Sequence, residues 1–251
     1  MITLIGTGHV FRIAEPVAFI VKNIWPDAVL VELDESRYKM ITNTSPDVAD
    51  DDGDGRAYRR LARYQRETAK EQGSRVGAEF IAAVETGRTI GAAIEFIDLN
   101  ASETMDEVWN EMSFAERTRF SFSMFFDRFR SKKKAEDAVQ EFADNEERYF
   151  ESMRKRYPTL VRKLIDERNA HMAEKIKEAA ERYDNVVAVV GDGHVNGISK
   201  LIEDGSPGMR SIRMIRLKTL MGTEEMNALR AELWSGKGSA DDPNEASEGR
   251  E

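Results

Sequence analysis

The stretches Leu4–Val10 (LIGTGHV) and Val189–Val195 (VVGDGHV) repeat one pattern, Gly-x-Gly-His-Val, directly after an apolar run. Each predicts a short buried strand, a tight turn in which glycine tolerates unusual backbone angles, and an imidazole at the strand's carboxyl end. In open α/β sheets, ligands bind at that edge. The chain holds only three histidines, so His9 and His194 in the same local frame indicate one shared site. The turn-forming residues would be Gly6, Gly8, Gly191 and Gly193.

The apolar pattern around these stretches alternates between strand and helix periods. It predicts strands at 2–5, 29–33, 90–99, 186–190 and 211–217, and helices at 14–24, 34–40, 58–72, 76–85, 158–183 and 223–234. The first strand, helix and strand fit in about thirty residues, the length of a βαβ unit with parallel neighbours. We therefore expect an α/β fold with a mainly parallel central sheet and flanking helices.

A large helical insertion is predicted at about 104–157, between the third and fourth strands. Ser113 and Glu116 form a capping box there. Phenylalanines follow at helical spacing, at Phe122, Phe125, Phe126 and Phe129. Such a stripe is typical of core packing, or of a dimer surface or a hydrophobic substrate wall. We expect residues 1–235 to form one domain that dimerises through this insertion, and the acidic residues 236–251 to be a disordered tail.

Composition excludes several classes of function. Without cysteine there are no disulfides, thiolate metal ligands or thiol nucleophiles. The net charge is −9 and the basic runs are short, so nothing indicates a nucleic-acid partner. No apolar run approaches the roughly 20 residues of a membrane helix, and no signal peptide opens the chain. We therefore expect a cytoplasmic protein without a membrane partner.

A glycine turn after a first strand also suggests dinucleotide binding. That fingerprint needs a third glycine, and the chain has Phe11 and Asn196 at the corresponding positions of the two copies. The pattern therefore favours an imidazole site over a cofactor site.

A carboxylate joins the two imidazoles at the predicted edge, because Glu32 ends the second strand. Two imidazoles and a carboxylate with an open position are a ligand set of metal hydrolases, and nitrogen and oxygen donors suit Mn²⁺, Co²⁺ or Zn²⁺. Alternatively, each imidazole only caps its own turn by hydrogen bonding.

An arginine interrupts the apolar stripe of the long helix predicted at 158–183. The guanidinium of Arg168 cannot be neutralised, so burial requires an acid or an anionic ligand. It either pairs structurally with an acid (Glu32, Asp34 or Asp98) or stabilises an oxyanion. The adjacent Glu167 is the candidate general base.

Four blocks of the chain together resemble the TraB/PrgY/TIKI family. They are GTGHV at 6–10, PDAVLVELDESRY at 26–38, LIDERNAHMAEKI at 164–176 and VVGDGHVNGI at 189–198. The resemblance implies a core related to the erythromycin esterase-like and ChaN-like proteins. Some members, of the TIKI type, are metal-dependent peptidases that use Mn²⁺ or Co²⁺, and others are linked to the shutdown of peptide pheromones. The resemblance points to His9, Glu32, Arg37, Glu167, Arg168 and His194 as site residues.

The chain departs from this family pattern in two places. Many members have Asp-Arg after the third strand, whereas here Leu99 follows Asp98. Many members also carry C-terminal membrane spans, whereas this chain ends in an acidic segment and resembles a soluble form.

These observations predict a metal-dependent hydrolase, most specifically a peptidase that attacks peptides with a metal-activated water. His9, His194 and Glu32 would hold the ion, Glu167 would act as base, and Arg168 or Arg37 would stabilise the oxyanion. The alternatives are a metal-free hydrolase that uses histidine and Glu32, and a protein that sequesters peptides without cleaving them.

Overall fold

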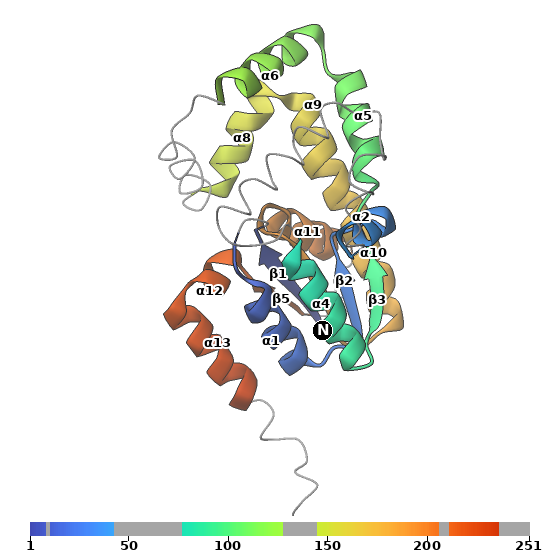
Figure 1. Ribbon diagram of the computed structural model, residues 1–251, viewed down its shortest axis with the longest axis vertical. Helices are drawn as coiled ribbons and strands as arrows, with labels where there is room; N and C mark the ends of the chain where they lie inside the picture. Colours follow the sequence, from blue (N-terminus) through green and yellow to red (C-terminus); the bar gives the residue numbers. More distant parts are fainter. Residues whose placement is uncertain (9–10, 43–76, 128–144, 206–210, 236–251) are drawn as a thin grey trace, which may run out of the picture.

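The computed structural model describes residues 1–8, 11–42, 77–127, 145–205 and 211–235. Five strands form one sheet in the order β3-β2-β4-β1-β5, and every neighbouring pair is parallel (Figure 1). The strands are β1 (Ile2–Thr7), β2 (Ala28–Val31), β3 (Ala93–Phe96), β4 (Val186–Gly191) and β5 (Ile212–Ile215). The predicted α/β class with a parallel central sheet is confirmed.

The described helices cover both faces of the sheet and also lie beyond the carboxyl ends of its strands (Figure 1). They are α1 (Ala14–Ile24), α2 (Glu35–Thr42), α4 (Ala78–Thr89), α5 (Ala101–Glu111), α6 (Phe114–Asp127), α8 (Glu146–Arg156), α9 (Pro158–Val161), the π-helix η2 (Arg162–Glu167), α10 (Arg168–Arg182), α11 (Asp192–Gly205), α12 (Leu217–Met221) and α13 (Thr223–Ser235). The helix predicted at 58–72 lies outside the described residues.

The third strand is shorter than predicted, because α4 runs on to Thr89 and the strand starts only at Ala93. Gly91 has a φ of 79°, a left-handed conformation that costs glycine little and that ends the helix. The apolar residues at 90–92 therefore belong to a turn.

Alternation along the strands separates two apolar cores. Ile5, Val187 and Val189 point to the face covered by α1, α4 and α13. Leu4, Ala188 and Val190 point to the opposite face, against α10 and α11. Because side chains alternate with a period of two, the continuous apolar runs of these strands are those of a sheet buried on both faces.

The helical insertion lies beyond the carboxyl ends of the strands, where α5, α6, α8 and α9 form a separate layer (Figure 1). It has a small core of its own around Met105, Val108 and Met112. The predicted capping box is present, since the backbone N–H of Ser113 donates to Glu116 Oε2 at 3.1 Å and the backbone N–H of Glu116 donates to Ser113 Oγ at 3.2 Å.

The phenylalanine stripe cannot be placed in this layer. The side chains of Phe122, Phe125 and Phe126, and the whole of Phe129, lie outside the described part of the chain.

Candidate functional site

The two repeated glycine stretches lie side by side in the structure. In the register of β1 and β4, Gly6 is opposite Val190 and Thr7 is opposite Gly191. β2 pairs with the other side of β4, which brings Glu32 to the same edge. His9 lies outside the described residues, so the structure places the backbone that leads to this imidazole and not the imidazole itself.

The glycines of these stretches do not adopt left-handed backbone angles, which corrects that part of the prediction, and Gly6, Gly8 and Gly191 instead pack closely against side chains. Among the described residues, positive φ occurs at Gly77, Gly91 and Trp25 only. A Cβ on Gly6 would stand 2.1 Å from Asp192 Oδ1, and one on Gly8 would stand 2.8 Å from the ring of Phe11.

At the second stretch, a Cβ on Gly191 would stand 3.3 Å from Glu32 Oε2. Gly193 lies within the first turn of α11. The absence of a Cβ at Gly6 and Gly191 therefore leaves room for the carboxylates of Asp192 and Glu32.

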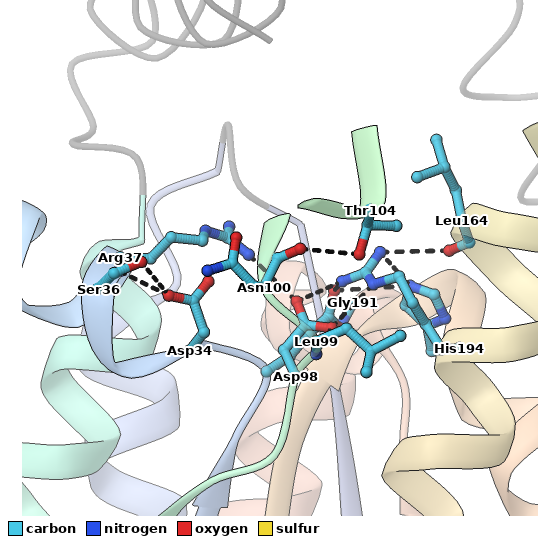
Figure 2. A network of polar contacts seen from close by, with 12 residues as sticks. Asp34, Ser36, Arg37, Asp98, Leu99, Asn100, Thr104, Leu164, Gly191 and His194 are labelled. Carbon is cyan, nitrogen blue, oxygen red and sulfur yellow. Dashed lines mark hydrogen bonds and ion pairs between the residues drawn. The ribbon is translucent and has the colours of Figure 1, made fainter. Parts of the chain in front are cut away.

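Arg168 lies at the centre of the site, and all five of its N–H groups have acceptors. Two of them bind Asp98 as a fork, with Nε at 2.9 Å from Oδ1 and Nη2 at 2.7 Å from Oδ2. Nη2 also donates to Glu32 Oε1. Nη1 donates to the carbonyl of Leu164 at 3.2 Å and lies 3.3 Å from Nε2 of His194. Figure 2 shows Asp98 and His194 on opposite sides of this network.

A π-helical turn presents the carbonyl of Leu164 to this guanidinium. Residues 158–183 were predicted as one helix, but η2 interrupts it immediately before Arg168. Such turns disturb the regular hydrogen-bond ladder of a helix and are frequent at functional sites. The interruption lets Arg168 bond to a backbone carbonyl of its own helix in addition to the two acids.

Asp98 is shared by both arginines of the site. Its side chain is 1% exposed and it accepts from Arg37 Nη1 at 3.2 Å and from the backbone N–H of Leu99 at 2.9 Å. Arg37 comes from α2, whose first turn is capped by Asp34, since the backbone N–H of Arg37 donates to Asp34 Oδ1 at 2.9 Å. The carboxylate thus fixes two guanidiniums at the ends of β2 and β3.

Burial and charge oppose one another at Arg168. Burial on its own would lower the pKa of the guanidinium, but the carboxylates of Glu32 and Asp98 raise this pKa above its usual value. The formal charges of Glu32, Asp98, Arg37 and Arg168 sum to zero, because two carboxylates face two guanidiniums. The cluster is therefore charge-balanced as it stands.

The imidazole of His194 is buried, with 6% of the residue exposed, and both ring nitrogens are engaged. Nδ1 lies 2.7 Å from Oδ1 of Asn169, and Nε2 lies 3.3 Å from Arg168 Nη1 and 3.5 Å from Glu32 Oε1. Arginine can only donate hydrogen bonds and an amide oxygen can only accept them, so the two contacts together favour the tautomer with the lone pair on Nε2 and the proton on Nδ1. The imidazole thus presents its lone pair at the carboxyl edge of the sheet.

Glu167 does not join this cluster, although it precedes Arg168 in the chain. Its carboxylate is 38% exposed and lies 3.0 Å from Lys163 Nζ, with a second ion pair to Arg162. Lys163 also pairs with Glu107 at 2.8 Å and with Glu111 at 2.9 Å. Glu167 therefore belongs to a charge network that joins η2 to α5.

A sequence model of the TraB/PrgY/gumN family matches residues 1–204 of this chain. The chain belongs to this family. It is also 28% identical over 211 residues to an uncharacterised protein of Methanocaldococcus jannaschii, a match that covers 80% of this chain and 53% of the relative. The chain thus spans about half the length of that family relative.

No helix among the described residues of this family member is long and apolar enough to cross a membrane.

The family resemblance implies a divalent metal, for which Glu32 and His194 would be the described ligands. Glu32 Oε1 and His194 Nε2 are donors of the right kind and face one point, but Arg168 contacts both atoms. An ion of charge +2 there would replace a guanidinium of charge +1 and leave the balanced cluster with one net positive charge. Within the described ranges, no three His, Cys, Asp or Glu residues come together as a metal site. In this arrangement Arg168 occupies both atoms, and the third predicted ligand, His9, lies outside the described residues.

Two residues of the site were missed or underrated by sequence reasoning. Asn169 gave no signal, because a single amide in a charged helix is unremarkable. Asp98 was noted as one of three possible partners for Arg168, and its shared role follows only from the meeting of α2, α10 and the end of β3.

Proposed function

We propose that this family member is a hydrolase in which His194 and Glu32 activate a water molecule for attack on a carbonyl carbon, with peptides as the expected substrates. The observation that carries the proposal is the distance of 3.5 Å between His194 Nε2 and Glu32 Oε1, both buried at the carboxyl edge of a parallel sheet. Ligands bind at this edge in open α/β folds. The family resemblance supports peptides as the substrate class.

The lone pair on Nε2 gives His194 the role of general base. A water that approaches Nε2 would transfer a proton to the imidazole as its oxygen attacks. The imidazolium so formed would lie beside the carboxylate of Glu32, which stabilises the positive charge. Arg168 Nη1 lies 3.3 Å from Nε2, a long hydrogen bond that the entering water has to replace.

The two arginines have different roles in this scheme. Every donor of Arg168 is occupied, so this residue holds the acids in place and does not bind the substrate. Arg37 makes one side-chain hydrogen bond among the described contacts, to Asp98, and its side chain is 21% exposed. We assign the oxyanion of the tetrahedral intermediate to the other N–H groups of Arg37.

Metal dependence remains a separate proposal. His194 and Glu32, together with His9 as predicted from the sequence, would hold the ion, which would polarise the carbonyl and lower the pKa of the bound water. No step above requires the ion, because Arg168 contacts both Glu32 and His194 in the described arrangement.

The test is a peptide-library cleavage screen with the full chain, run with chelator and with added Mn²⁺, Co²⁺ or Zn²⁺. We expect cleavage that survives chelation and falls about 10²-fold or more in His194→Ala and Glu32→Gln. His171→Ala, in which the histidine outside the cluster is replaced, is the matched control and should retain full activity. Stoichiometric peptide binding without turnover would refute the proposal, and activity only with added metal would replace the metal-free scheme.

We also propose that two copies associate through the helical insertion. Two of its aromatic side chains are exposed, Phe114 at 86% and Trp109 at 39%. Trp109 lies in α5 and Phe114 begins α6, and exposed apolar patches are typical of contact surfaces.

A further inference from the structure

Asn169 is a buried amide that the proposed reaction does not use. It follows Arg168 in α10, only 6% of the residue is exposed, and its Oδ1 lies 2.7 Å from His194 Nδ1. A buried amide on the far side of a candidate base is placed to hold the ring and not to bind the substrate.

The packing of α10 against α11 makes room for this amide. Gly197 lies three residues after His194 in α11, on the same side of the helix. A Cβ on Gly197 would stand 2.3 Å from Nδ2 and 3.1 Å from Cγ of Asn169. Any larger residue at 197 would therefore displace the amide from the imidazole.

We propose that Asn169 is a positioning residue that fixes the tautomer and ring orientation of His194, and that Gly197 supplies the space it needs. The amide oxygen accepts a hydrogen bond from Nδ1–H, so the lone pair stays on Nε2. Arg168 and Glu32 lie next to that nitrogen. The catalytic meaning of this contact rests on the proposed hydrolase function, but the contact itself does not.

An amide suits this position better than an acid would. Glu32, Asp98, Arg37 and Arg168 already balance in charge, and a carboxylate at 169 would add one negative charge. The amide oxygen provides the acceptor while leaving that balance unchanged.

The experiment reads the tautomer directly, without substrate. The full chain is labelled with ¹⁵N-histidine, and correlations between ring nitrogens and ring protons assign the tautomer of each imidazole. The chain holds only three histidines, so His194→Ala and His171→Ala assign the signals. We expect wild-type His194 to carry its proton on Nδ1 alone.

Variants then test whether Asn169 and Gly197 determine the tautomer of His194. Asn169→Ala and Gly197→Ala should each convert His194 to a mixture of tautomers or to the Nε2–H form, whereas Asn169→Asp retains an acceptor and should keep the Nδ1–H form. The wild-type spectrum decides even if a variant does not fold, because an Nε2–H form there overturns the proposal. A His194 tautomer unchanged in a folded Asn169→Ala protein also overturns it.

Activity provides an independent readout. If peptides are cleaved, Asn169→Ala should lower kcat by about 10- to 100-fold and leave KM unchanged. A chain with the predicted tautomers and no hydrolysis would refute the hydrolase proposal and leave the positioning role intact.

Discussion

Replacement of Arg168 by methionine tests whether the ion cluster holds the carboxyl edge of the sheet together. The side chain of Arg168 is 16% exposed, against 4% for Glu32 and 1% for Asp98. Methionine fills space flexibly but leaves both acids buried without this cation. Glu32 would keep the backbone N–H of Gly191, and Asp98 would keep Arg37.

The expected loss of unfolding free energy follows from the desolvation of the two acids. Removing one partner of a buried ion pair costs about 3–5 kcal/mol, a large part of the roughly 5–15 kcal/mol that holds a domain folded. We expect Arg168→Met to lower the free energy of unfolding by about 3–5 kcal/mol and the midpoint of thermal unfolding by roughly 6–20 °C.

Urea unfolding at neutral pH, followed by circular dichroism, measures this loss. The matched control is Arg162→Met on the preceding π-helix, because its ion pairs with Glu111 and Glu167 are exposed to solvent and exposed pairs contribute little. Adding Glu32→Gln to Arg168→Met should recover part of the loss, since one uncompensated charge is removed. Equal losses in Arg168→Met and Arg162→Met would refute the reasoning.

Three further predictions concern the surroundings of the site. Gly6→Ala should lower the free energy of unfolding by about 1–3 kcal/mol in thermal melts, because the new Cβ would stand 2.1 Å from Asp192 Oδ1. The loss should be smaller in an Asp192→Ala background. An equal loss in that background would show that the clash is with another group. Burial raises the pKa of Glu146 above 4.5 despite the ion pair with Arg216, so the folded state holds this proton more tightly and stability falls as pH rises through the window above 4.5. Glu146→Gln should remove that part of the pH dependence in urea titrations, and an unchanged slope would contradict it. Light scattering at micromolar concentration should give a dimer mass for the wild type and a lower mass for Phe114→Glu, and a wild-type monomer would exclude the proposed association.

The strands and the edge that carries the candidate site could be predicted because their signals are local. Buried parallel strands read as apolar runs, and the βαβ order places their carboxyl ends together. The position of β4 between β1 and β2 has no local signal, yet it brings Glu32 to Gly191. The sequence therefore predicts that these strand ends lie at one edge of the sheet, but it does not predict the contacts between their side chains.

The misplacement of Glu167 has a geometric cause. Adjacent helical residues point about 100° apart, so neighbours at i and i+1 do not share a face. Arg168 points to the sheet edge, and Glu167 points to Lys163. The partner of Asn169 was hidden for a different reason, because it depends on the packing of α10 against α11 at Gly197, residues far apart in the chain.

The helical insertion is joined to the core by the same ion pair that organises the site. Asp98 lies in the segment between β3 and α5. In the same segment, Asn100 caps α5 by accepting from the backbone N–H of Ser102 at 2.9 Å. Arg168 begins α10, directly after the last turn of η2. The fork between Asp98 and Arg168 thus closes the base of the insertion at the point where the chain leaves the sheet and returns to it.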